Sequence, residues 1–280
     1  MVIIIYLKKI FYFTLILVIL SLNKSISVEA NPPANVTSPF FYNFNSNGIL
    51  YESGSESAST SPYFWLNSGA KLIIANEIGK TIQNELPIND YWRLLYFNSN
   101  PIDTDNGLHP QNIFRVLTRS KWQNVKQIMS FKITKDELSS SPNRDSHNGL
   151  LLMTRYIDSN NLYYAGLRVD GAAVIKKKIN GNYYTLAYRN IFPGTYNRLT
   201  NPNLLPKNTW IGLKIETKNN LNGSVSIKLY MDNGLTGTWT LLLSATDSGI
   251  GGSPITNEGY AGIRTDFMDV YFDNYWLVNI

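Results

Sequence analysis

The sequence contains no cysteine, and it is poor in histidine and in charged side chains. The absence of cysteine from its 280 residues excludes a disulfide framework, a thiolate metal site and a cysteine nucleophile. Only 16% of the residues are charged and only two are histidine. An aromatic content of 13% excludes an intrinsically disordered chain, because such chains have few aromatic side chains to bury. This composition favours a β-rich globular protein.

The first 30 residues have the pattern of an export signal. Lys8 and Lys9 precede a predominantly apolar run over residues 10–22, and a polar stretch then ends in Val28-Glu29-Ala30. This order is typical of a secretory signal peptide, and the run is shorter than the ~20 residues of a membrane span. We therefore expect residues 1–30 to direct export to a secreted, cell-surface or periplasmic location, with an uncleaved signal anchor as the alternative.

The rest of the chain is predicted to form one domain. Without the leader the formal net charge falls from +5 to +3, so charge gives no argument for nucleic acid as a partner. Residues 31–39 are a short lead-in segment that contains proline, and residues 40–280 contain no long linker, repeat or charge block. One domain over residues 40–280 is the simplest organisation.

Most readable segments alternate between apolar and polar residues with a period of two, which predicts strands with one buried face. Trp210–Glu216 and Ser224–Met231 show this pattern. In 163–170, the alternation directs Ala165 and Leu167 to one side of the strand. Asn180-Gly181 separates two such runs and predicts a tight β-hairpin. The chain is therefore predicted to be all-β, a two-sheet antiparallel β-sandwich or jelly roll.

Very few short helices are expected in this sandwich. Ile88–Leu95 is one candidate, with Asp90 as its cap, and Thr134–Leu138 is a weaker one.

Three segments of the C-terminal half carry a resemblance to a known superfamily: Tyr164–Lys178, Trp210–Glu216 and Gly259–Tyr275. They resemble successive strands of the concanavalin A-like lectin/glucanase superfamily, which includes laminin-G-like domains and jelly-roll polysaccharide lyases. The resemblance covers residues 40–280 at the level of fold. It implies a curved sandwich whose concave face holds a sugar chain, either bound or cleaved.

A set of polar and aromatic residues suits binding of an acidic sugar on that face. Strand alternation places Tyr164, Arg168 and Asp170 on one side of a strand, and Lys176 and Lys178 lie on the next strand. A guanidinium binds a carboxylate through two hydrogen bonds, and a tyrosine ring stacks on a sugar. The alternative is a solvated outer face with extended lysine side chains. The candidate substrate-binding residues are Tyr164, Arg168, Asp170, Lys176, Lys178 and Tyr184.

Cleavage would need further residues. A lyase needs a cation or amide to neutralise the uronate carboxylate and a base for the neighbouring proton. Arg115 or Gln127 could neutralise the carboxylate, and His109 or Tyr164 could accept the proton. The sequence departs from the lyase pattern at Gln127. The Gln-x-His triplet of these lyases would require a histidine at position 129, where this chain has Met129. A glycoside hydrolase needs a pair of catalytic carboxylates. Asp269 and Asp273 are the only candidates for such a pair that the sequence offers.

One structural calcium ion is a further expectation, because jelly-roll domains often bind Ca²⁺ through oxygen ligands. Asp273 is the best candidate ligand, with Asn43 or Asn45. Taken together, the sequence predicts an exported carbohydrate-binding protein whose partner is an extracellular polysaccharide. Nucleic acid is not expected as a partner, and no stable membrane span is expected after the signal is removed. The alternatives are a polysaccharide lyase, less well supported a glycoside hydrolase, and a structural or adhesive surface protein.

Overall fold

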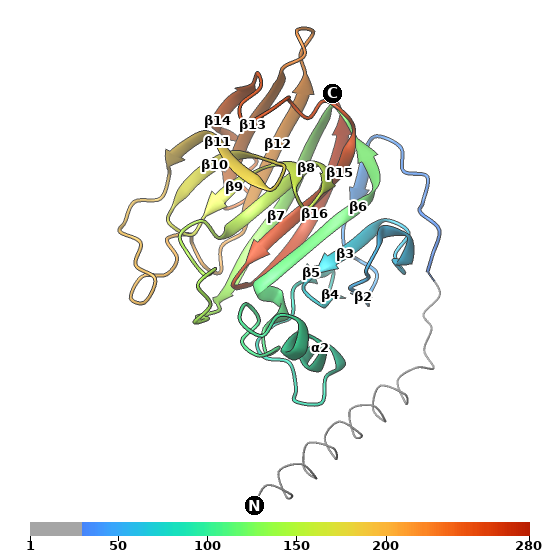
Figure 1. Cartoon of the computed structure of the whole chain (residues 1–280), viewed down its shortest axis with the longest axis vertical. Helices are drawn as coiled ribbons and strands as arrows, with labels where there is room; N and C mark the ends of the chain where they lie inside the picture. The colour runs from blue at the N-terminus through green and yellow to red at the C-terminus, as the bar shows by residue number, and fades with distance from the viewer. Residues whose placement is uncertain (1–29) are drawn as a thin grey trace, which may run out of the picture. The chain divides into compact units, whose positions relative to one another are not determined.

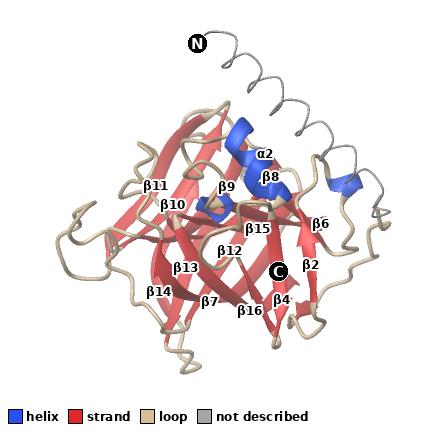
Figure 2. Ribbon diagram, turned by 90° about the horizontal axis from the view of Figure 1, so that it is seen from below, coloured by secondary structure: helices blue, strands red, loops and turns tan. Residues whose placement is uncertain are grey.

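The computed structural model describes residues 30–280, so the predicted signal peptide lies outside the described residues apart from Ala30. The described chain forms two antiparallel β-sheets that pack face to face (Figure 1). Strands make up most of it, and helix is confined to short segments (Figure 2). The predicted two-sheet β-sandwich is therefore confirmed. Within residues 30–280, no helix is both long enough and apolar enough to span a bilayer.

The larger sheet has nine strands in the order β14-β13-β12-β7-β16-β5-β4-β2, with β1 paired to β16. Each pairing that defines this sheet is antiparallel. Its strands are β1 (Phe40–Tyr42), β2 (Gly48–Tyr51), β4 (Lys71–Ala75), β5 (Ile78–Lys80), β7 (Val125–Asp136), β12 (Ile211–Asn219), β13 (Val225–Asn233), β14 (Thr240–Asp247) and β16 (Met268–Asn279).

The smaller sheet has seven strands in the order β11-β10-β9-β8-β15-β6-β3, again antiparallel throughout. Asn180 and Gly181 both have positive φ, 49° and 82°, which suits the tight turn of the predicted hairpin between β10 and β11. The strands of this sheet are β3 (Phe64–Ser68), β6 (Ile113–Trp122), β8 (Gly149–Asp158), β9 (Asn161–Arg168), β10 (Ala172–Ile179), β11 (Asn182–Asn190) and β15 (Gly259–Asp266).

One of the two predicted helices exists. Helix α2 spans Tyr91–Ser99 rather than Ile88–Leu95, and Asp90 caps it by accepting a hydrogen bond from the backbone N–H of Trp92. The helix lies in the long connection between β5 and β6, at one end of the sandwich (Figure 1). The other prediction, a helix over 134–138, is wrong, because those residues lie mostly in strand β7, which pairs with β16 as far as Asp136. Two 3₁₀ turns, Glu56–Ala58 and Pro110–Asn112, complete the helical segments of the described chain.

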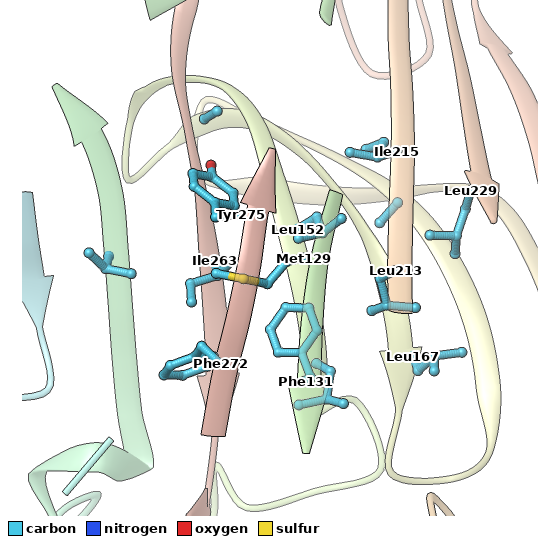
Figure 3. Close-up of a cluster of buried hydrophobic side chains, with 14 of the residues drawn as sticks. Met129, Phe131, Leu152, Leu167, Leu213, Ile215, Leu229, Ile263, Phe272 and Tyr275 are labelled. Atoms are coloured by element: carbon cyan, nitrogen blue, oxygen red, sulfur yellow. The ribbon is translucent and has the colours of Figure 1, made fainter. Parts of the chain in front are cut away.

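The core lies between the facing sheets. Met129 and Phe131 of β7 and Phe272 of β16 meet Leu152 of β8 and Ile263 of β15 there, all fully or almost fully buried (Figure 3). Burying one such side chain stabilises the fold by roughly 1.5–3 kcal/mol. The prediction for strand β9 is confirmed, because Ala165 and Leu167 belong to this core.

A buried polar network joins the two sheets at one side of the core. The Lys177 Nζ lies 2.8 Å from the Asp247 Oδ2, and both side chains are fully buried. The Tyr163 hydroxyl donates to the same carboxylate oxygen over 2.5 Å. Burial acts to raise the pKa of Asp247, but Lys177 and Tyr163 hold it below its ordinary value. Lys177 thus points away from its neighbours Lys176 and Lys178, and it is paired inside the protein rather than solvated.

Removing the charge of Asp247 should destabilise the protein. We expect D247N to lower the free energy of unfolding by about 3–5 kcal/mol, because the Lys177 ammonium would then be buried without a counter-charge. Urea denaturation measures this loss. The matched control is K207M, which removes the exposed partner of Asp136 in an ion pair of 2.7 Å, and about 0–1 kcal/mol is expected there. Equal losses in both variants would contradict a role for the buried pair.

Candidate functional site

A groove is hollowed into the face of the seven-stranded sheet that points away from the core. Its volume is about 240 Å³. All seven strands of this sheet contribute side chains to it. Its lining residues are Ser68, Ile113, Arg115, Met153, Ser159, Leu162, Tyr164, Lys178, Tyr183, Arg264 and Asp266.

The groove shows that this sheet is strongly curved. Arg115 lies on β6 and Tyr183 on β11, five strand positions away. In a flat sheet with strands about 4.8 Å apart, these strands would be about 24 Å from each other. Both residues nevertheless line one cavity. The outer face of the seven-stranded sheet is therefore concave.

The floor of the groove is apolar. Met153 of β8 and Leu162 and Tyr164 of β9 belong to a buried cluster on this outer face, separate from the core between the sheets. Tyr164 is only 9% exposed, and burial raises its pKa above the ordinary value. The sheet thus buries apolar side chains on both of its faces, and the polar groups of the groove stand on an apolar base.

Two guanidinium groups face each other across neighbouring strands. Arg115 of β6 is directly opposite Arg264 of β15 in the strand register. The Nε of Arg264 donates to the Oδ1 of Asp266 over 2.7 Å, whereas the buried Nε of Arg115 has no hydrogen-bond partner. Burial lowers the pKa of Arg115, and Arg264 lowers it further. Burial also raises the pKa of Asp266, and its pairing with Arg264 offsets part of that rise.

Tyr183 forms the opposite side of the groove. Its side chain is 49% exposed, and its ring lies 6.2 Å from that of Tyr164 at an interplanar angle of 75°. The Lys178 Nζ lies 4.6 Å from its ring centre. Burial acts to raise the pKa of Tyr183, but the neighbouring cations Arg264 and Lys178 bring it below its ordinary value. This phenol therefore loses its proton more easily than an isolated tyrosine.

The predicted substrate-binding residues have different positions. Tyr164 and Lys178 line the groove, and Lys176 lies opposite Tyr164 on the adjacent strand. Arg168 is on the same outer face, but its Nη2 is 2.5 Å from the Asp170 Oδ2 and its Nε donates to the Ser146 carbonyl. Arg168 and Asp170 thus neutralise each other beside the groove instead of lining it.

Tyr184 does not reach the groove, because adjacent residues of a strand point to opposite faces. Its ring packs against Gly251, where an added Cβ would lie 2.3 Å from a ring carbon of Tyr184. Tyr183 is the member of the pair that lines the groove. The two neighbouring tyrosines thus diverge as alternation predicts, and the groove gives no support to substrate binding by Tyr184.

The four predicted catalytic residues do not come together. Arg115 and Tyr164 share the groove. Gln127 is on β7 of the other sheet, fully buried, and donates to the Gly262 carbonyl and the Tyr275 hydroxyl inside the core. His109 precedes a 3₁₀ turn and contacts Asp105 and Glu137, at 2.9 and 3.3 Å. The geometry thus separates Gln127 and His109 from the groove.

The carboxylates considered for hydrolysis or calcium binding lie outside the groove. Asp269 accepts hydrogen bonds from the Asn84 backbone and the Gln111 side chain. Asp273 accepts from its neighbour Asn274 at an irregularity in β16. Pairing of β1 with β16 brings Asn43 near this irregularity. Within residues 30–280, no three His, Asp or Glu side chains are grouped as metal ligands would be. Calcium binding at Asp273 stays a prediction.

Sequence reasoning missed Arg264 and Asp266. They are separated by one residue at the end of β15, so they share a face of the strand. The same segment, Gly259–Asp266, was used as evidence for the fold and not for the site. An Arg-x-Asp pair on one face of an otherwise apolar strand is the signal that would have identified them.

A second, more open depression of about 660 Å³ lies beside the turn at residues 219–224. Asparagine side chains dominate its lining, and Lys218 is the single charged residue in it. It lacks the converging charges and aromatic rings of the groove.

Comparisons with known proteins find similar folds at low sequence identity. No protein-family model and no curated protein matches the chain. Among solved structures, the chain is similar to the carbohydrate-binding module CBM66 from Bacillus subtilis, with 17% identity, a TM-score of 0.42, and coverage of 60% of this chain and 83% of the module.

Two similar structures come from Bacillus licheniformis. The GH43 protein BlXynB has 12% identity and a TM-score of 0.47, with 89% of this chain covered and 41% of that protein. A β-glucanase has 10% identity and a TM-score of 0.45, with 88% of this chain and 100% of that chain covered. The fold of this chain, a curved two-sheet antiparallel sandwich, is the one that the resemblance to the concanavalin A-like superfamily implies, and it follows from the strand order and register of the two sheets.

The acidity of Tyr183 is open to direct measurement. In an alkaline titration followed by ultraviolet absorbance, the Y183F variant should lack a tyrosine that ionises at lower pH than an ordinary phenol, because Arg264 and Lys178 favour the phenolate. In K178M, the pKa of Tyr183 should move upward. If the group lost in Y183F titrates at or above the ordinary range, the cations do not act on Tyr183 as described.

Proposed function

We propose that the protein binds a polysaccharide chain in the groove of the seven-stranded sheet. The observation that carries the proposal is the convergence of aromatic, hydrogen-bonding and charged side chains from seven strands into one concave cavity. The volume of about 240 Å³ is close to the lower end of small-molecule sites, roughly 300 Å³. It suits one sugar unit, with the rest of a chain running along the open face.

The chemistry of the lining matches that of a sugar. A sugar ring presents apolar C–H faces and a rim of hydroxyl groups. The half-exposed Tyr183 ring and the side chains of Met153 and Leu162 offer apolar contact, while Ser68, Ser159 and Asp266 add hydroxyl and carboxylate oxygens. That the polysaccharide is extracellular depends on the export signal predicted from residues 1–30.

Loss of the Tyr183 ring should weaken binding without unfolding the protein. In gels that contain a polysaccharide to which the protein binds, we expect Y183A to be retarded less than the unaltered protein. The Tyr183 ring is the most exposed aromatic surface of the groove. The matched control is Y51A, which removes a tyrosine of 41% exposure from β2 of the other sheet. A thermal melt verifies that both variants fold. Equal binding by Y183A and Y51A would count against the groove.

Cleavage by β-elimination is the second candidate, and the lowered pKa of Tyr183 favours it. In that reaction, the Tyr183 phenolate would remove the proton on the sugar carbon next to the carboxylate. The electron pair then forms a carbon–carbon double bond while the bond to the glycosidic oxygen on the adjacent carbon breaks. The leaving oxygen takes the proton back from Tyr183. A positioned base of this kind contributes roughly 10²–10⁴-fold.

A lyase would give a product that absorbs in the ultraviolet, because its new double bond is conjugated with the carboxylate. If Tyr183 is the base, absorbance should rise when the protein is mixed with uronate polymers, and Y183F should reduce the rate by at least about 100-fold. Binding of these polymers without any rise in absorbance would leave binding as the function and remove the lyase.

A further inference from the structure

We propose that Arg115 forms an anion-binding subsite of the groove, so that the sugar bound there is acidic and carries a carboxylate or a sulfate group. The inference rests on the proposed glycan binding and names its substrate class. It holds whether the chain is only bound or also cleaved.

The first observation is that the buried Nε of the half-buried Arg115 lacks a partner, whereas fully buried arginines of the described chain have several partners. Its buried Nε makes no hydrogen bond, and no carboxylate of residues 30–280 lies within ion-pair distance of it. Arg155, by contrast, donates to the Gln123 and Ile255 carbonyls and to the Asn219 side chain. A buried N–H group without a hydrogen-bond partner is costly, and a bound anion would relieve that cost.

Two further arginines confirm the contrast. Arg119 is bound by the Glu56 carboxylate and by the Ser61 carbonyl. Arg168 is bound by Asp170 and by the Ser146 carbonyl. The guanidinium groups of Arg119 and Arg168 are thus occupied by hydrogen bonds within the protein. Arg115 is the one that lines the groove while its Nε remains free.

The second observation is the excess of positive charge around Arg115. Arg264 lies directly opposite in the register, and like charges directly opposite each other destabilise a sheet. Asp266 is paired with Arg264 at 2.7 Å and acts on Arg115 only at longer range. Lys178 adds another positive charge to the lining. Three cations and one carboxylate therefore surround the cavity, and an anion between the arginines would balance them.

The third observation is the position of the guanidinium group. The Arg115 Cζ lies 5.4 Å from the ring centre of Tyr156, and the Tyr156 ring belongs to the buried cluster on this face. Packing of the guanidinium on an aromatic ring restricts its orientation and leaves its N–H edge for an acceptor that presents two oxygens side by side. A carboxylate or a sulfate offers such a pair of oxygens.

The test compares charged and neutral polymers on one protein. Affinity electrophoresis with polygalacturonate, dextran sulfate and unmodified dextran covers a carboxylate, a sulfate and no charge. We expect tighter binding to one or both charged polymers than to dextran. R115Q should weaken that binding by about 10- to 100-fold, the effect of losing a hydrogen-bonded charge, and weaken dextran binding much less. The polymer that R115Q affects more identifies the acidic group.

Two controls separate charge from position. R189Q removes an equal charge from β11, where Arg189 is exposed and absent from the groove lining; its binding should equal that of the unaltered protein. R115K keeps the charge but loses the planar fork, so it should restore only part of the affinity. If R189Q weakens binding as much as R115Q, the effect is general attraction and the subsite is wrong.

A readout without polymer guards against misfolded variants. The melting temperature of the unaltered protein should rise with glucuronate or inorganic sulfate and not with glucose, and R115Q should show no such rise. R115Q itself should melt no lower than the unaltered protein, because it removes a half-buried positive charge opposite Arg264. Equal binding of dextran and charged polymers by both proteins would overturn the acidic subsite and leave glycan binding standing. Failure of every polymer and of the melting shift would overturn both.

Discussion

The curvature of the seven-stranded sheet is the constraint on which the groove depends. The sheet buries alternate residues against the nine-stranded sheet, so the intervening residues of every strand face outward together. If the sheet were flat, Arg115 and Tyr183 would lie far apart and could not share a ligand. Since the sheet is curved, side chains from all seven of its strands converge above an apolar floor. Packing on one face thus determines which side chains form the proposed binding groove on the other face.

Charge is distributed in two distinct ways in this protein. The arginines and the lysine that hold the fold, such as Arg155 and Lys177, are surrounded by carbonyl oxygens or by a carboxylate. Their charges are compensated inside the protein, as burial requires. In the groove, the positive charge is only partly compensated. Asp266 pairs with Arg264, and the Nε of Arg115 has no hydrogen-bond partner. The cations that hold the fold therefore have partners inside the protein, whereas the Nε of Arg115, in the proposed site, has none.

Strand alternation was the most reliable signal in the sequence. It predicted the strands over 210–216 and 224–231, the hairpin at Asn180-Gly181 and the inward direction of Ala165 and Leu167. It failed at residues 134–138, because a short polar and apolar segment is ambiguous until its pairing partner β16 is known. It also could not decide which of Tyr183 and Tyr184 faces the groove, because alternation determines that two neighbours diverge but not which face each one takes.

What the sequence determined by itself is local: the β-rich class, the turns and the faces of single strands, because these follow from side-chain period and turn chemistry within a few residues. Only the tertiary structure decided which strands are neighbours and how far the sheet curls. Those features placed Arg115 opposite Arg264, placed Gln127 in the other sheet and paired Arg168 with Asp170. Contacts between residues distant in the chain depend on the packing of the whole sandwich, and no local pattern encodes them.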